Sequence, residues 1–122
     1  MRKLFVALIV ASTLVASIAS AFDPADLKKL KETNECMECD LTLIDLSDEN
    51  LSGANLSKTD LTDAYLVGAN LSNSKLSEAI MADTDLTEAN LSKAYLFKTN
   101  LTKANLTGAD LTEANLSHAN LP

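Results

Sequence analysis

Residues 54–78 read ANLSK TDLTD AYLVG ANLSN SKLSE, which are five consecutive units of five residues each. From Leu41 to Leu121 every fifth residue is leucine, except at Met81. The residue two places before the leucine is small in most units, and the residue directly before it is Asp or Asn in 13 of 17 units. The sequence is therefore a tandem repeat with a period of five.

Neither an α-helix nor a flat strand can bury all of these leucines. In an α-helix, five residues rotate by about 500°, so successive leucines would drift around the axis by roughly 140°. In a strand, side chains alternate between faces, so every second leucine would point into water. If the chain turns by about 90° at each unit, four units close a square coil of about 20 residues and every leucine points to the axis. We expect these coils to stack through backbone hydrogen bonds.

Units such as Ala54–Lys58 and Ala109–Glu113 resemble the A(D/N)LXX motif of the pentapeptide repeat family, and the resemblance covers residues 39–122. It implies an all-β solenoid, namely a right-handed quadrilateral β-helix of about four coils. Ile44 and Glu49 depart from the small inward residue in the first coil, and Ala79–Asp83 departs from the motif at three places.

The first 21 residues have the pattern of a signal peptide. Met1–Lys3 is a positive start, an apolar run follows, and Ala19–Ala21 offers a cleavage site before Phe22. The alternative is an uncleaved anchor, because Leu4–Ala21 contains 18 apolar or small residues, near the lower limit for a membrane span. We expect an exported protein without a span after cleavage, periplasmic or secreted. Exported relatives similar to it also suggest the thylakoid lumen if the source is photosynthetic.

Residues 22–38 are expected to form a cap on the first coil. Asp23 suits a helix N-cap and Pro24 suits the first turn, so we predict a short helix over 24–33. Cys36 and Cys39 both fall on inward positions and should meet. In an oxidising compartment this favours a structural disulfide over a redox or metal-binding pair.

Outward apolar residues are the candidate interaction surface. Tyr65 and Val67 share one unit, whereas Tyr95 and Phe97 share another that lies six units further on. That spacing predicts opposite faces of the tube, and Ile80 is a further candidate.

The last coil shows no capping signal, and we expect the coil to be exposed and apolar. An uncapped coil favours association. We therefore predict a homodimer through this coil, with Leu116 and Leu121 as candidate contacts.

Composition and motifs argue against catalysis and against binding to nucleic acid. The formal charge is -7, which disfavours contacts with phosphates. We find no catalytic triad, no phosphate-binding loop and no metal-ligand set, so we expect no enzyme, no cofactor and no metal site. The leading interpretation is an exported, non-catalytic protein that acts as a rigid protein–protein interaction or structural module, with an unknown partner.

Two alternatives to this interpretation stay open. The resemblance to the pentapeptide repeat family suggests a DNA mimic that inhibits or protects a DNA-binding enzyme such as gyrase. A structural element of the envelope that stacks end to end is a third interpretation.

Overall fold

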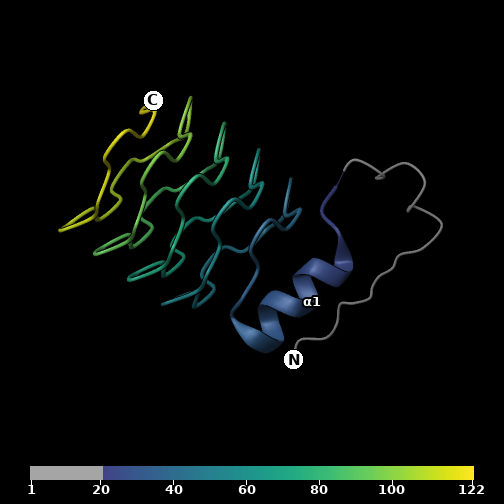
Figure 1. Ribbon diagram of the computed structural model, residues 1–122. Helices are drawn as coiled ribbons and strands as arrows, with labels where there is room; N and C mark the ends of the chain where they lie inside the picture. The colour runs from purple at the N-terminus through teal and green to yellow at the C-terminus, as the bar shows by residue number, and fades with distance from the viewer. Residues whose placement is uncertain (1–20) are drawn as a thin grey trace.

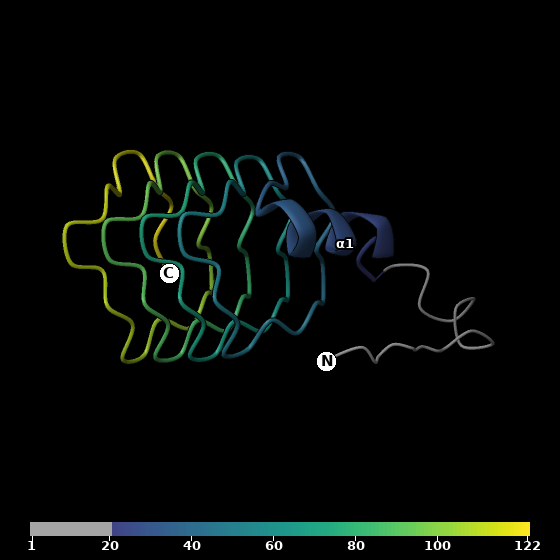
Figure 2. The ribbon, with the colours of Figure 1, turned by 90° about the horizontal axis from the view of Figure 1, so that it is seen from below.

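The computed structural model describes residues 21–122 as a solenoid with one helix at its N-terminal end (Figure 1). The predicted signal peptide, residues 1–21, lies outside the described residues except for Ala21. Helix α1 spans Pro24–Thr33 and covers the first coil, while the later coils stack away from it (Figure 2). Over residues 21–122 the structure contains no helix long and apolar enough to cross a membrane.

Helix α1 begins and ends at the residues whose local chemistry favours a boundary. The Asp23 carboxylate accepts a hydrogen bond from the Ala25 N–H at 2.9 Å, which satisfies one of the free amides of the first turn. At the other end Asn34 adopts the left-handed region (φ 60°), and its N–H donates to the Leu30 carbonyl. The Leu30 side chain is buried in the core of the solenoid, so the helix closes the apolar end of the first coil.

The coils are joined by parallel bridges between residues that are 20 positions apart. Asn50 bridges to Asn70 and Asn70 bridges to Asn90, and such bridges continue from Glu35 to Asn120. Within residues 21–122 each bridge is isolated, because the chain turns again before a longer strand can form. The expected β-helix is thus held by single paired residues on each side, rather than by extended strands.

Every corner of the tube is a β-turn with one residue in the left-handed region. The Ala54 N–H donates to the Leu51 carbonyl at 3.1 Å, and Gly53 between them has φ +71°. A positive φ at the third turn residue alone identifies a type II turn, which favours glycine. Lys58 and Asp63 take the same place with φ 59°, although this region costs a residue with a Cβ roughly 1–2 kcal/mol.

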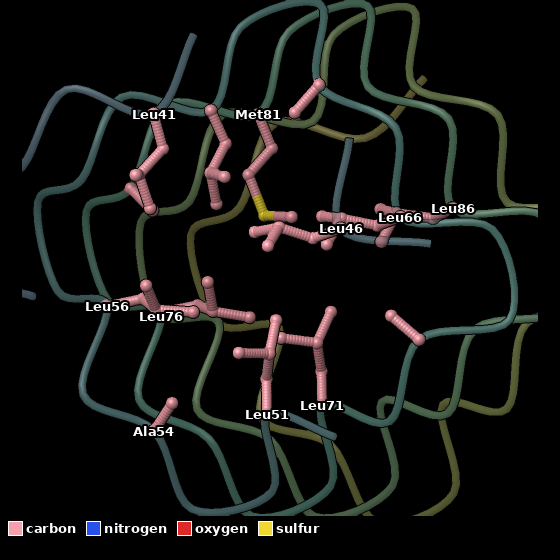
Figure 3. Packing of buried hydrophobic residues seen from close by; sticks show 14 of the residues in the cluster. Leu41, Leu46, Leu51, Ala54, Leu56, Leu66, Leu71, Leu76, Met81 and Leu86 are labelled. Carbon is pink, nitrogen blue, oxygen red and sulfur yellow. The ribbon is translucent and has the colours of Figure 1, made fainter. Parts of the chain in front are cut away.

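The inward leucines fill the axis of the tube. Figure 3 shows them approaching from four sides, with Leu46 and Leu66 stacked on one side and Leu51 and Leu71 stacked on another. Leu66 is fully buried, and burial of one leucine side chain contributes about 1.5–3 kcal/mol. Met81 replaces a leucine and is equally buried, since its unbranched side chain adapts to the space.

The two departures from the small inward residue in the first coil have different outcomes. Ile44 is buried in the core. Glu49 is half-exposed, and its Oε1 lies 3.0 Å from Lys31 Nζ of α1. The charged residue at an inward position is therefore accommodated because the adjoining helix supplies a cation at the edge of the tube.

Inward hydroxyl groups bond to carbonyls of the preceding coil. Thr84 Oγ1 donates to the Leu61 carbonyl at 2.8 Å, and Thr99 Oγ1 donates to the Leu76 carbonyl at 2.7 Å. Ser74 occupies an equivalent position, but its buried Oγ has no hydrogen-bond partner among residues 21–122. A buried hydroxyl without a partner is destabilising.

Replacement of the unpartnered serine should stabilise the fold. We expect Ser74→Ala to raise the free energy of unfolding by about 1 kcal/mol, because it removes the buried hydroxyl and most units already carry alanine there. Thr99→Val is the matched control, and it should lower the free energy of unfolding by about 1 kcal/mol because it removes a hydrogen bond that is made. Urea denaturation followed by circular dichroism measures both, and a destabilised Ser74→Ala variant would refute the prediction.

Candidate interaction surfaces

Most residues directly before a leucine use their side chain to close their own corner. Asp60 Oδ1 accepts from the Thr62 N–H at 3.0 Å and from Thr62 Oγ1 at 2.6 Å. We call this contact from an Asp or Asn oxygen to the N–H two residues later the Asx clamp; it satisfies a corner amide locally. The clamp also occurs at Asp40, Asp45, Asn50, Asn55, Asn70, Asp85, Asn90, Asn100, Asn105, Asp110 and Asn115.

Four units place another residue type where the clamp would be. These residues are Tyr65, Lys75, Ile80 and Tyr95. The two tyrosines are 51% and 53% exposed, and Ile80 is 41% exposed. A scattered exposed hydrophobic residue needs no explanation. Here, however, each apolar residue replaces one that has a defined structural role, which marks these three positions as candidates for contact with a partner.

The predicted surface residues lie on three different faces of the tube. Tyr65 bridges to Asp85 and Tyr95 bridges to Asn115. The two tyrosines are one and a half coils apart, so they lie on opposite faces, and the face of Ile80 is between them along the coil. The predicted residues therefore form separate patches and not one continuous surface.

The aromatic ring of Phe97 is already engaged within the molecule. Its centroid lies 5.5 Å from that of His118 in an edge-on arrangement, and Lys98 Nζ lies 5.3 Å from the Phe97 centroid. His118 lies at an outward, exposed position and was not among the residues predicted for the interaction surface. Phe97 and His118 are one coil plus one residue apart in the sequence. The stacking of positions 20 residues apart could therefore have predicted that their side chains lie close together.

Charge is distributed unevenly among the side faces, which are defined by positions 20 residues apart. On the adjacent faces of Tyr65 and Ile80 nearly all charged residues are acidic. On the Tyr95 face, which lies opposite the Tyr65 face, acidic and basic residues are equal in number. The Tyr65 face comprises Asp45, Asp48, Tyr65, Val67, Asp85 and Glu88. The Ile80 face comprises Asp40, Asp60, Asp63, Ile80, Asp83 and Lys103. The Tyr95 face comprises Glu35, Glu38, Lys58, Lys75, Glu78, Tyr95, Phe97 and Lys98.

The carboxylate of Asp85 on the Tyr65 face is held in its charged form. Thr87 donates to Asp85 Oδ1 from its Oγ1 at 2.5 Å and from its N–H at 3.0 Å. These two hydrogen bonds lower the pKa of Asp85 below its ordinary value, and Thr112 lowers the pKa of Asp110 in the same way. In these two units the hydrogen bonds from threonine therefore favour the ionised carboxylate.

The predicted disulfide is present between Cys36 and Cys39, with an S–S distance of 2.04 Å. Both cysteines are buried, and the Cys36 carbonyl accepts a hydrogen bond from Thr59 Oγ1 in the next coil. The disulfide thus fixes the segment between α1 and the first coil. In the described part of the chain no group of three or more His, Cys, Asp and Glu residues is arranged to hold a metal ion.

The residues predicted to form a dimer contact lie in the last coil. Leu116 is half-buried and Leu121 is exposed. The amides of Leu106, Leu111 and Leu116 have no backbone acceptor within residues 21–122, whereas equivalent amides in earlier coils donate to the next coil. This end of the described solenoid thus exposes apolar side chains together with free backbone donors.

The model for pentapeptide repeats matches residues 35–73, 64–102 and 89–122, with eight copies. The chain belongs to the pentapeptide repeat family. Its solved relatives support the right-handed β-helix that the repeat implies. No curated protein matches the sequence.

Three solved structures of pentapeptide repeat proteins from cyanobacteria are similar to this chain. HetL from Nostoc sp. strain PCC 7120, which is involved in regulating heterocyst differentiation, is 38% identical with a TM-score of 0.71 over 72% of this chain. The match covers only 40% of HetL. The protein alr5209 from Nostoc PCC 7120 is 32% identical (TM-score 0.64; 73% of this chain, 74% of that one). Rfr23 from Cyanothece 51142 is 26% identical (TM-score 0.52; 80% and 94%).

Removal of one clamp hydrogen bond should change the titration of Asp85. In Thr87→Val the hydroxyl donor is lost, so the pKa of Asp85 should rise toward its ordinary value, whereas Thr87→Ser should keep it low. Because the folded-state pKa is lowered, this carboxylate stabilises the fold above its unfolded pKa, and the stabilisation is lost as the pH falls through the folded value. Carboxyl ¹³C NMR titration measures the shift; an unchanged pKa in Thr87→Val would contradict the assigned cause.

Proposed function

We propose that this pentapeptide repeat protein is an exported, non-catalytic module of about four coils that binds a partner protein through the rigid side faces of its solenoid. The observation that carries the proposal is the replacement of the Asx clamp by exposed Tyr65, Ile80 and Tyr95. The tube positions these side chains on a backbone paired above and below, so a partner would meet a preorganised surface.

The inward side chains support a role without catalysis. The axis is filled by leucine, methionine and small residues, and the inward threonines donate their hydroxyl protons to backbone carbonyls. His118, the single histidine of the chain, contacts Phe97. A general acid or base needs a second polar group and a substrate within hydrogen-bonding reach.

The buried disulfide supports export. Disulfides persist in oxidising compartments and are rare in the cytosol, and the sequence of residues 1–21 has the pattern of a signal peptide.

A DNA-mimicking function has less support, because Lys58, Lys75 and Lys98 alternate with carboxylates along the Tyr95 face. End-to-end stacking also has less support, because α1 covers one end of the tube.

Site-specific photo-crosslinking in the source cells tests the proposed module. A photoreactive amino acid at position 65, 80 or 95 should capture a discrete partner in the envelope or medium, because these side chains are exposed. The same residue at Asn50, which is exposed directly before a leucine on the face opposite Ile80, is the matched control and should capture none. Failure at all three positions, or capture only in the cytosol, would refute the proposal.

We further propose that two copies associate through the coil that contains Leu116 and Leu121. The free amides and exposed apolar side chains of that coil support such a contact. Small-angle scattering over a concentration series should show a dimer, and Leu116→Asp with Leu121→Asp should shift it to the monomer. Ser77→Asp with Ala82→Asp, on side faces of earlier coils, is the control. A monomer at high concentration would refute the dimer.

A further inference from the structure

The surroundings of Tyr65 are uniformly anionic. Its bridge partners in the coils above and below are Asp45 and Asp85, and Asp63 precedes it by two residues at the same corner. Asp45 and Asp85 both make the Asx clamp, which fixes their carboxylates at the surface beside the tyrosine. An exposed aromatic ring therefore stands between two fixed negative charges.

A glycine on the same face makes room for a further carboxylate. A Cβ at Gly68 would lie only 2.4 Å from Asp48 Oδ1, so the Asp48 side chain occupies the space over this glycine. Glu88 lies over Gly108 in the same column, with its Cγ 3.2 Å from the place of a Cβ. The Tyr65 face thus alternates carboxylates with glycines along the tube and presents no lysine or arginine.

The aromatic residues of the opposite face have a different environment. Tyr95 bridges to Lys75 and Asn115, and neither is anionic. Phe97 already has Lys98 over its ring, so an ammonium group of the chain itself occupies a site that an external cation could use. The Tyr95 face therefore provides an internal comparison, with similar apolar residues but without the negative field.

From this contrast we infer that the Tyr65 face is a docking site for a cationic segment of a partner protein, in which a lysine or arginine side chain lies on the Tyr65 ring and flanking cations pair with Asp45 and Asp85. The inference rests on the proposed interaction function and specifies its partner class. A cation over an aromatic face is attracted by the ring quadrupole, and adjacent carboxylates add charge complementarity and orient the approach. The Ile80 face, which shares the corner at Asp63, extends the same negative surface.

The binding test uses a fluorescent 12-residue peptide with arginine at alternate positions and glycine or serine between them. Fluorescence anisotropy with the full mature protein measures the dissociation constant at low and at physiological salt. A peptide with glutamine in place of each arginine is the ligand control and should not bind. Binding should weaken as salt rises, because the paired charges are exposed.

Matched variants separate a built site from general attraction to an acidic protein. Asp45→Asn with Asp85→Asn removes two charges and keeps the Asx clamp, because asparagine makes it in other coils. This variant should weaken binding about tenfold, and Tyr65→Ala should weaken it about fivefold.

Glu38→Gln with Glu78→Gln removes two charges from the Tyr95 face, and Tyr95→Ala removes its tyrosine. We expect each of these control variants to change binding less than about twofold. Circular dichroism melts verify that every variant is folded.

Each result decides for or against the site. Equal weakening by the two charge variants, an unchanged dissociation constant in Tyr65→Ala, or no binding of the arginine peptide would overturn the inference. The proposed interaction function would survive those results if positions 80 or 95 still capture a partner by crosslinking. Conversely, the Tyr65-face variants alone could weaken peptide binding while crosslinking captures no partner. That result would support a site for cationic peptides on the Tyr65 face and refute the interaction module proposed above.

Discussion

The structure depends on a corner that recurs every five residues. At each corner a carbonyl accepts from the amide three residues later, and the residue before that amide lies in the left-handed region, as Gly53 does. The corner directs the next leucine to the axis and sets the backbone in register with the coils above and below. The hydrogen bonds between coils offset the local cost of positive φ at residues with a Cβ, so lysine and aspartate are tolerated there.

Much of the fold was predictable because the period of five leaves one arrangement in which all leucines are inside. The helix signals at Asp23 and Pro24 lie at the observed start of α1. The left-handed corner was not predicted, because only a few units place glycine there and Lys58 or Asp63 carries no such signal. Likewise, the acceptance of Glu49 depends on where α1 places Lys31, which the repeat does not specify.

The repeat predicted which side chains of the candidate surface are exposed, but it did not predict which residues surround them. An outward position in the repeat exposes Tyr65, Ile80 and Tyr95 whatever surrounds them. Whether such a residue is free requires its neighbours in adjacent coils, and Phe97 is occupied because Lys98 and His118 reach its ring. The core and the surface are thereby separated within each unit: the leucine and the small residue form the core, while the residue before the leucine either closes the corner or leaves its side chain exposed.

The 20-residue coil also constrains how such a protein can change in length. An insertion of four units would add one full turn and leave every downstream side chain on its original face. An insertion of a single unit between Tyr65 and Tyr95 would shift every later residue by one face. The two tyrosines would then lie on adjacent faces of the tube instead of opposite ones. Indels in this family therefore act as angular steps, and descendants that conserve a two-sided surface should differ in length by whole turns between its parts.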